Sequence, residues 1–456
     1  MRTTRLIGCL LAVSALALIG GAPASAFLDG TVVLPVSKGQ ETSEPHIAIN
    51  PKDPNNVLVV SHVSTTKVNT QPAWTKLGYW SSTDGGTTWG SGLVLNGSFE
   101  GQTAAGSDPV AAFGPDGAAY YAGLVVPIKR RSWQSLVVLG RSSDAGHTFS
   151  DYFVIARTQN KGSLADSILA GGDSPYGVLN DKEWVAVDQT AGPHSGTVYA
   201  AWDKVSLRTD AKEELLFSRL LPGSSSFTGT QLIAKSDGSA RTVAKNGYFP
   251  QVSVRPDGTV DLVWVQGVAN SIGKDKLLHA FSTDGGASFS SPQTIASTNK
   301  YAAVHVPSLA TSASGKLFAC WTQIYFKAES AVVLCSHSDD GLLWSAPTPL
   351  EPNEPSSVVQ ALPAVAAQGE RFWATAYLAG RYKSRVALYR SDDSGASFSR
   401  FQTLATLKKP SDDDNFVGDY TGLATTPDHV VAAYVLPESA KRSAHNKLYV
   451  SSVLAP

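Results

Sequence analysis

The sequence predicts an all-β protein, a seven-bladed β-propeller of four-stranded antiparallel blades, and two repeated patterns support this prediction. The first is a block of the form Ser-x-Asp-x-Gly-x-Thr/Ser-Trp/Phe, which begins at Ser82 and recurs along the chain. The second is a short apolar strand, a turn of the Pro-Asp-Gly type and another strand ending in an aromatic residue, which occurs seven times. Such repetition indicates one supersecondary unit used several times, and no stretch shows sustained helical periodicity.

The first strand of each unit is a short apolar segment that often begins with proline. The seven expected first strands are 45–49, 109–113, 184–187, 250–254, 307–310, 363–366 and 420–424. Second strands follow the turns, for example over 196–202, 258–264 and 315–321. The last unit ends at 446–454 without a fourth strand, and the N-terminal segment 31–36 can supply it. A ring closed in this way leaves no free sheet edge.

The repeated block predicts the turn between the third and fourth strands. Its Asp carboxylate accepts hydrogen bonds from backbone amides just ahead, while Gly supplies a left-handed backbone position. Apolar β-type residues precede each copy, as expected for a hairpin connection. We expect these acids to stabilise turns and not to catalyse, because acids at several peripheral turns cannot share one site. The predicted turn acids are Asp84, Asp144, Asp284, Asp339 and Asp393.

The ends and the composition predict an exported protein. Residues 1–26 have the positive start, apolar stretch and small-residue cleavage site of a signal peptide, which leaves 27–456 as a single propeller domain. No later stretch is long and apolar enough to span a membrane. A net charge of −1 with 16% charged residues disfavours nucleic acid as a partner. We expect a secreted or periplasmic monomer.

Two cysteines remain after the signal peptide. Cys320 and Cys335 flank an expected hairpin whose turn lies near Lys327, and counting outward from that turn places them opposite one another. In an oxidising compartment this arrangement permits a cross-strand disulfide. The alternative is a pair of buried free thiols.

Acidic residues gather where the first strands begin. Strand directions alternate within a blade, so these starts lie on the face opposite the Asp turns, around an opening that we call the mouth. Like charges gathered there raise at least one carboxyl pKa, as general acid catalysis requires, and a pair of carboxyl groups is the usual arrangement for glycoside cleavage. The same acids can instead tie neighbouring blades together. The carboxylates at four of the seven starts are Glu44, Asp108, Asp181, Glu183 and Asp419.

The chain resembles the Asp-box (BNR-repeat) sialidase-like β-propellers, and the recurring Ser-x-Asp-x-Gly blocks carry this resemblance. It implies a catalytic mouth on the face opposite the boxes, with six blades as the alternative because sialidases have six. The order Asp108, Glu183, Tyr420 parallels the acid/base, Glu and Tyr of that family, and Asp419 joins them as a catalytic candidate. The mouth residues expected to bind substrate are Glu44, His46, Arg130, Arg208, His305 and Arg381.

One departure from the family limits the resemblance. Sialidases carry an Arg-Ile-Pro motif before the first box, whereas this chain has Glu44-Pro45-His46 there, and its first arginine after the signal is Arg130. A cationic clamp for sialic acid is therefore not expected. We expect no cofactor; a ring of oxygen ligands can also hold calcium, but no calcium-loop motif is present.

Three functions are compatible with this sequence. The first is a glycoside-cleaving enzyme, sialidase-like in fold, that acts on an extracellular glycan or polysaccharide by hydrolysis or elimination. The second is a non-catalytic propeller that binds a glycan or a protein through its mouth loops. The third is a structural propeller without a small-ligand site.

Overall fold

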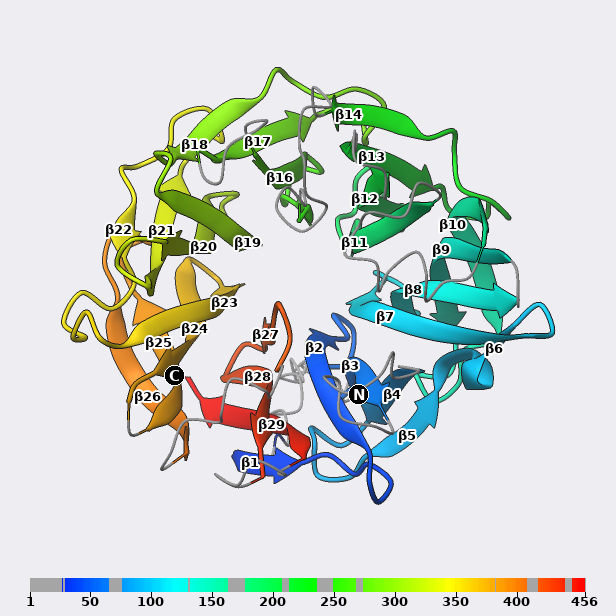
Figure 1. Ribbon diagram of the computed structural model, residues 1–456, viewed down its shortest axis with the longest axis horizontal. Helices are drawn as coiled ribbons and strands as arrows, with labels where there is room; N and C mark the ends of the chain where they lie inside the picture. The colour runs from blue at the N-terminus through cyan, green and yellow to red at the C-terminus, as the bar shows by residue number, and fades with distance from the viewer. Residues whose placement is uncertain are drawn as a thin grey trace, which may run out of the picture.

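The protein folds into a ring of seven antiparallel sheets around a central axis (Figure 1). The computed structural model describes residues 27, 29–64, 76–129, 132–162, 177–206, 213–235, 249–267, 274–381, 383–407, 417–438 and 445–455. The predicted seven-bladed propeller is confirmed, and the six-bladed alternative is wrong. The signal peptide predicted at 1–26 lies outside the described residues.

Six blades consist of four consecutive strands ordered from the axis outward, the seventh takes its outermost strand from the N-terminus, and the second blade carries an additional short strand, β6. The strands of blades one to three are β2 (Glu41–Ile49), β3 (Val57–Ser64), β4 (Lys76–Ser82) and β5 (Gly90–Leu93); β7 (Gln102–Phe113), β8 (Ala119–Lys129), β9 (Ser132–Ser142) and β10 (Asp151–Lys161), with β6 (Ser98–Phe99); and β11 (Val178–Val187), β12 (Val198–Ser206), β13 (Glu213–Leu220) and β14 (Gln231–Lys235). One turn of 3₁₀ helix, Val94–Gly97, follows β5.

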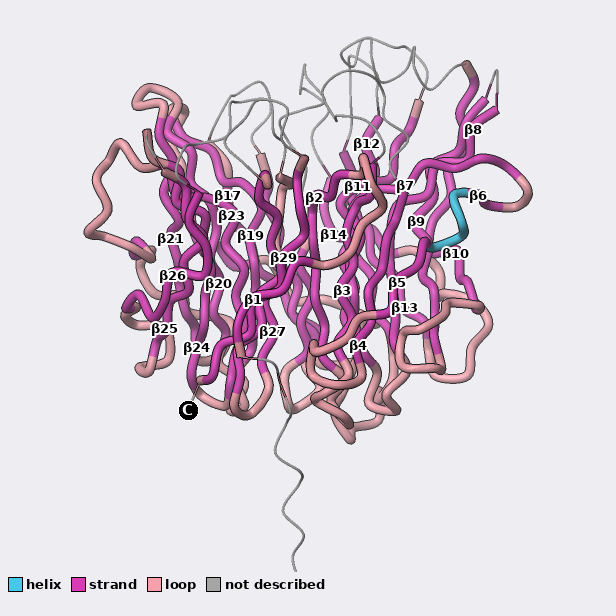
Figure 2. The backbone as a smooth tube through the Cα atoms, turned by 90° about the horizontal axis from the view of Figure 1, so that it is seen from below, coloured by secondary structure: helices cyan, strands magenta, loops and turns pink. Residues whose placement is uncertain are grey.

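Blades four to seven repeat this plan, and Figure 2 shows the strands running between the two faces of the ring. Their strands are β15 (Gln251–Val254), β16 (Val260–Gln266), β17 (Lys276–Ser282) and β18 (Gln293–Ser297); β19 (Ala302–Thr311), β20 (Leu317–Tyr325), β21 (Ser330–Ser338) and β22 (Thr348–Pro349); β23 (Val359–Gln368), β24 (Arg371–Ala379), β25 (Ser384–Ser391) and β26 (Ser399–Leu407); and β27 (Gly422–Thr425), β28 (His429–Pro437), β29 (Asn446–Leu454) and β1 (Gly30–Val33).

The N-terminal strand closes the ring, as the sequence predicts. Strand β1 pairs antiparallel with β29, in register from Gly30 opposite Ser452 to Val33 opposite Tyr449. The hydroxyl groups of Thr31 and Ser451 lie 2.7 Å apart across this pair. The seventh blade therefore contains both ends of the folded domain. Its third strand, β29, is paired on both sides and leaves no open edge.

The core lies between the blades. The aromatic residue at the end of a second strand is fully buried in three consecutive blades, as Trp202, Trp264 and Trp321, each at most 1% exposed. Each indole belongs to a buried cluster that also contains residues of the preceding blade. The repeated aromatic of the sequence is therefore the contact that joins neighbouring blades, because a large apolar face is removed from water on both sides.

The disulfide lies inside the fifth blade. Cys320 in β20 and Cys335 in β21 are directly opposite in register and form a disulfide, with their Cα atoms 4.1 Å apart. No helix in the described part of the chain is long and apolar enough to cross a membrane.

The Asp boxes stabilise the turns between third and fourth strands. At Asp84, one carboxylate oxygen accepts the amide of Thr88 at 2.9 Å and the other accepts its hydroxyl at 2.6 Å. The same pair of bonds recurs at Asp144, Asp284 and Asp393. At Asp284 the hydroxyls of Ser288 and Ser282 hold the carboxyl pKa well below its usual range.

The prediction is wrong for the turn acid of the fifth blade. In the fifth blade the turn is held by Asp340, whose Oδ1 accepts the amides of Leu342 and Leu343 at 2.8 and 3.0 Å. Asp339 is 78% exposed and lies 3.6 Å from the ammonium of Lys316. This block is one residue shorter between its Ser and its Gly, so alignment on the glycine selects the wrong acid. The structure retains the two-residue step from Ser to Asp.

Candidate functional site

The inner strands carry a β-bulge close to the mouth. Register shifts occur at this place in β2, β7, β11, β19 and β23. The bulged residues in the first three blades are Glu44, Asp108 and Lys182, with φ of 51°, 51° and 49°. A bulge turns its side chain out of the regular alternation of a strand. In this protein the bulges bring side chains from different blades to one point.

Lys182 lies at the centre of these side chains. Its Nζ lies 2.8 Å from Asp108 Oδ1, 2.5 Å from Asp419 Oδ2 and 3.6 Å from Glu44 Oε1. The four residues, which we call the mouth cluster, come from blades two, seven, one and three. Asp419 precedes β27, and its backbone amide lies 3.4 Å from Glu44 Oε1. One ammonium thus compensates three carboxyl groups that would otherwise repel one another.

A buried histidine lies behind the mouth cluster. The backbone amide of Asp108 donates to His62 Nε2 at 2.6 Å, so this nitrogen is an unprotonated acceptor. Ser43 Oγ lies 3.2 Å from Nδ1, where the ring proton must then reside. Glu44 Oε2 lies 3.1 Å from the same Nε2. The lone pair of Nε2 is already used by the amide of Asp108, so Glu44 Oε2 is close to this nitrogen without a hydrogen bond to it.

The pKa shifts agree with this geometry. Burial raises the pKa of Glu44 well above its usual value, and Lys182 offsets only part of that effect. Burial acts in the same direction on Asp108, but the charge of Lys182 and the hydrogen bonds from Lys182 and Ser107 outweigh it, and the pKa of Asp108 is lowered. Burial lowers the pKa of His62 to about 4. The two neighbouring carboxyl groups, Glu44 and Asp108, therefore have pKa values that are shifted in opposite directions.

Further acidic groups surround the cluster on β11. Burial, reinforced by Asp108, raises the pKa of Asp181 to about 7. Burial also raises the pKa of Glu183 well above its usual value. Glu183 is 2% exposed, and neither of its carboxyl oxygens has a hydrogen-bond partner in the described structure.

The mouth cluster is open to solvent on one side. The side chains of Asp419 and Lys182 are 26% and 15% exposed, whereas those of Glu44 and Asp108 are nearly buried. The Lys182 ammonium lies 5.8 Å from the centre of the Phe249 ring. A molecule that enters the mouth therefore meets Asp419 and Lys182 first.

Other predicted site residues have different surroundings. Tyr420 is buried, donates its hydroxyl to the carbonyl of Pro109 at 3.1 Å, and has a pKa raised well above the usual value by burial. His46 accepts the amide of Ala111 at 3.1 Å, and burial lowers its pKa to about 4. His46 therefore joins the neighbouring blades one and two, whereas Tyr420 links blade seven to blade two past blade one.

The predicted substrate-binding residues are not all gathered at the cluster. The ring of His305 lies 5.2 Å from that of Phe249, and burial lowers its pKa. Arg381 is exposed in the loop between β24 and β25. Arg130 and Arg208 lie outside the described residues.

Sequence reasoning missed Lys182 and His62. Lys182 lies between Asp181 and Glu183, two residues before the expected first strand, and it is the bulged residue of its blade as Glu44 and Asp108 are of theirs. A lysine in a ring of acids is the signal that could have identified it. Nothing in the sequence marks His62, which lies in a second strand.

The described residues of the mouth assemble no set of metal ligands. Among the described residues, no group of three or more His, Cys, Asp or Glu side chains has an arrangement that could hold a metal ion. The ammonium of Lys182 occupies the place among the carboxylates that a cation would need.

Comparison with known proteins identifies the fold. No family model matches the sequence, and no curated protein matches it. An ulvan lyase of polysaccharide lyase family PL25, solved with a -[GlcA(1-4)Rha3S]- ligand, superposes with a TM-score of 0.55 at 9% identity, covering 95% of this chain and 97% of that one. A protein of unknown function from Dyadobacter fermentans DSM 18053 gives 0.51 at 11% identity, covering 93% and 98%.

A Hadza microbial sialidase is also similar, with a TM-score of 0.45 at 13% identity over 94% of this chain and 97% of that one. This last similarity is too weak to carry an argument. Together, the stronger two show a shared propeller fold.

Proposed function

We propose that this protein is a secreted carbohydrate-active enzyme that cleaves an extracellular glycan at the mouth cluster. The observation that carries the proposal is the meeting of two carboxyl groups, Glu44 and Asp108, around the ammonium of Lys182, with pKa values shifted in opposite directions. Glycoside cleavage needs carboxyl groups in both states, and environments that push their pKa values apart mark acid and base. The similarity in fold to a propeller that is a polysaccharide lyase supports the same class of substrate.

The exposure of each residue in the mouth cluster suggests its role in the proposed reaction. Asp419 is the acid that reaches the opening, and we assign it the contact with the substrate. Lys182 positions Asp419 and keeps Asp108 ionised. Tyr420 has no part in this chemistry, because its hydroxyl is committed to the carbonyl of Pro109. We further propose that the chain works as a monomer and that its substrate is not a sialoside, since no arginine clamp precedes the first box.

A second function is favoured by a specific observation. Lys182 already contacts all three carboxyl groups of the cluster, which is what a tie between blades requires. Under this alternative the mouth binds a glycan or a protein and forms no product. Turnover separates the two functions.

The test is a screen of the intact secreted protein against polysaccharides, including ulvan and arabinan, and against sialosides, with chromatographic detection of products. We expect Asp419→Asn to lower turnover about 10²-fold or more, as is typical for loss of an acid/base group, without changing the unfolding midpoint. Asp339→Asn, on the opposite face, is the matched control and keeps full activity. Saturable binding without product supports the alternative, and full activity in Asp419→Asn ends the assignment of this site.

A further inference from the structure

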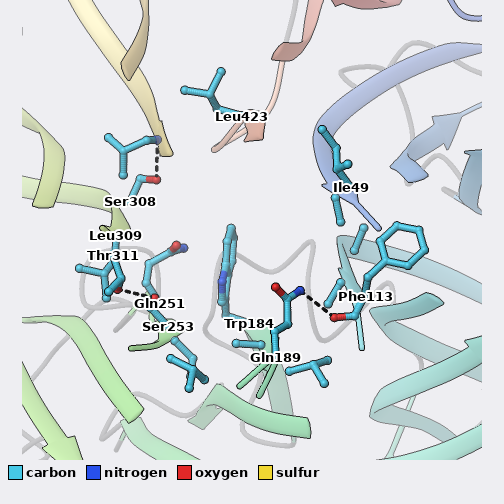
Figure 3. A pocket seen from close by; sticks show the side chains of 18 of the residues that line it. Ile49, Phe113, Trp184, Gln189, Gln251, Ser253, Ser308, Leu309, Thr311 and Leu423 are labelled. Carbon is cyan, nitrogen blue, oxygen red and sulfur yellow. Dashed lines mark hydrogen bonds between the residues drawn. The ribbon is translucent and has the colours of Figure 1, made fainter. Parts of the chain in front are cut away.

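A second hollow lies along the ring axis, distinct from the mouth cluster. It has a volume of about 680 Å³ and is lined by the inner strands of the blades (Figure 3). None of the four residues of the mouth cluster lines it. Because the turns after the inner strands also contribute, through Gln189 and Ala313, this axial channel extends toward the Asp-box face. Its volume lies within the range of sites that bind small molecules.

The indole of Trp184 lines the middle of the channel. Trp184 makes an edge contact with His46, with ring centres 4.8 Å apart, and another with Tyr420 at 6.1 Å. Figure 3 shows its indole between the amides of Gln189 and Gln251, seen nearly edge-on. A partly exposed indole face beside amide groups is the surface on which a sugar ring stacks.

Two polar side chains lie in the channel wall. Gln251 lines the channel and is 4% exposed. The Thr421 hydroxyl is buried without a hydrogen-bond partner in the described part of the chain, in a residue 6% exposed. By contrast, Gln189 donates to the carbonyl of Phe113 at 3.0 Å. A buried polar group without a partner costs about 1–3 kcal/mol and calls for an explanation.

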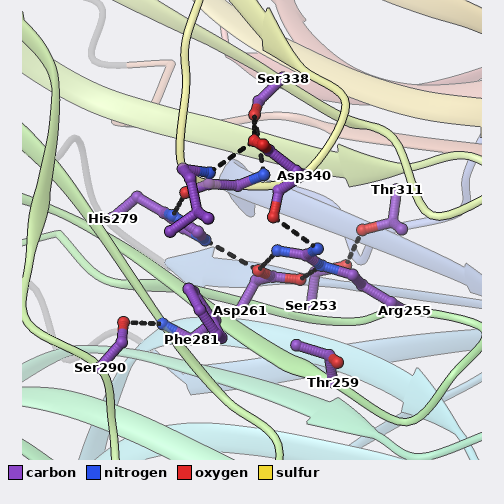
Figure 4. A network of polar contacts seen from close by, with 12 residues as sticks. Ser253, Arg255, Thr259, Asp261, His279, Phe281, Ser290, Thr311, Ser338 and Asp340 are labelled. Atoms are coloured by element: carbon purple, nitrogen blue, oxygen red, sulfur yellow. Dashed lines mark hydrogen bonds and ion pairs between the residues drawn. The ribbon is translucent and has the colours of Figure 1, made fainter.

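The channel wall offers no free charge. Among the described lining residues, Arg255 is the charged side chain, and it is committed to Asp261 through bonds of 2.8 and 2.6 Å (Figure 4). The lining histidine, His46, is neutral at physiological pH because burial lowers its pKa to about 4. An anionic or cationic ligand would therefore lose its hydration without gaining a counter-ion.

We propose that the axial channel is a binding site for a neutral saccharide. In this site a sugar ring stacks on Trp184, and its hydroxyl groups bond to the amide of Gln251 and the hydroxyl of Thr421. The proposal does not depend on cleavage at the mouth, because the two sites share no residue.

The test is calorimetric titration of the intact protein with three neutral trisaccharides, namely maltotriose, xylotriose and cellotriose, and with trigalacturonate as the anionic comparison. We expect at least one neutral trisaccharide to bind and trigalacturonate to bind more weakly. Gln251→Met keeps the size of the side chain and removes its amide, so we expect affinity to fall about tenfold, which corresponds to one lost hydrogen bond of about 1.4 kcal/mol. Trp184→Phe is a second variant, in which stacking is weakened while the ring contacts remain.

Asp419→Asn serves as the control for the mouth and leaves this binding unchanged. The proposal fails if no neutral trisaccharide binds at millimolar concentration, since water then fills the channel. It also fails if Gln251→Met binds as tightly as the wild type at an unchanged unfolding midpoint, or if Asp419→Asn alone abolishes binding, which would place the sugar at the mouth.

Discussion

Lys182 holds three carboxyl groups from three other blades within a few ångström of one another, and its own charge makes that arrangement possible. The interaction with these acids raises the pKa of Lys182 well above its usual value despite burial, so the ammonium stays protonated. We expect Lys182→Met to lower the free energy of unfolding at pH 7.5 by about 3–5 kcal/mol, as for removal of one partner from a buried ion pair. Urea unfolding measures this loss.

The pH dependence of this variant follows from the sign of the shifts. Without Lys182, burial and neighbouring charge raise the pKa of Asp108, so its protonated form is favoured in the folded state. The stability lost in Lys182→Met therefore returns as the pH falls from 7.5 toward 4.5. Lys182→Arg keeps the charge and loses less. Equal destabilisation of Lys182→Met at both pH values would show that packing, and not charge, explains the effect.

Glu213, at the start of β13, makes a separate contribution to the pH dependence of stability. Burial raises its pKa to about 8, with a further contribution from Asp181. Between the ordinary glutamate pKa and pH 8 the folded protein binds a proton that the unfolded chain has released, so stability falls as the pH rises, by up to about 1.4 kcal/mol per pH unit. We expect Glu213→Gln to flatten this decline. Urea unfolding of the variant and the wild type at pH 5, 6.5 and 8 tests it, and parallel curves would contradict the assignment.

At the scale of single elements, the sequence predicts the strands well and the mouth only in part. Repeats locate the inner strands, and the two-residue step from Ser to Asp locates most turns. The bulges are different, since glutamate and lysine have no preference for the positive φ that Glu44 and Lys182 adopt. Packing against neighbouring blades imposes it. For that reason the sequence predicts that the acids lie near the mouth, but it does not predict that they share a contact with Lys182.

The fifth Asp box offers a matched pair of acids for a test. Asp340 accepts two backbone amides, and its own carbonyl accepts Arg255 Nη1 at 3.0 Å, so the turn also joins the network around Asp261 and His279 (Figure 4). We expect Asp340→Ala to cost about 1–2 kcal/mol, comparable to loss of a capping side chain. Asp339→Ala, its exposed neighbour, stays within about 0.5 kcal/mol of the wild type. Urea unfolding measures both, and the reverse ranking would restore Asp339 as the turn acid.

At the scale of the whole molecule, the ring joins residues that are distant in sequence, and this explains where function can arise. Each blade is a local unit, but the mouth cluster exists only when blades seven, one, two and three are assembled, and the axial channel needs the inner strands of all seven blades. Blade seven is completed by β1, so the position of Asp419 depends on the closure by the N-terminal strand. Closure therefore links the stability of the ring to the geometry of both sites.

A disulfide across the closure tests this link. Thr31 and Ser451 are directly opposite in register with their hydroxyls 2.7 Å apart, and Cys320 and Cys335 show that opposed strand residues of this protein form a disulfide. We expect Thr31→Cys with Ser451→Cys to raise the free energy of unfolding by about 2–5 kcal/mol, because the closed loop contains nearly the whole domain. Each single variant is the control. Urea unfolding before and after mild reduction measures the gain, and an oxidised variant no more stable than its reduced form would mean that another step than strand separation opens the ring.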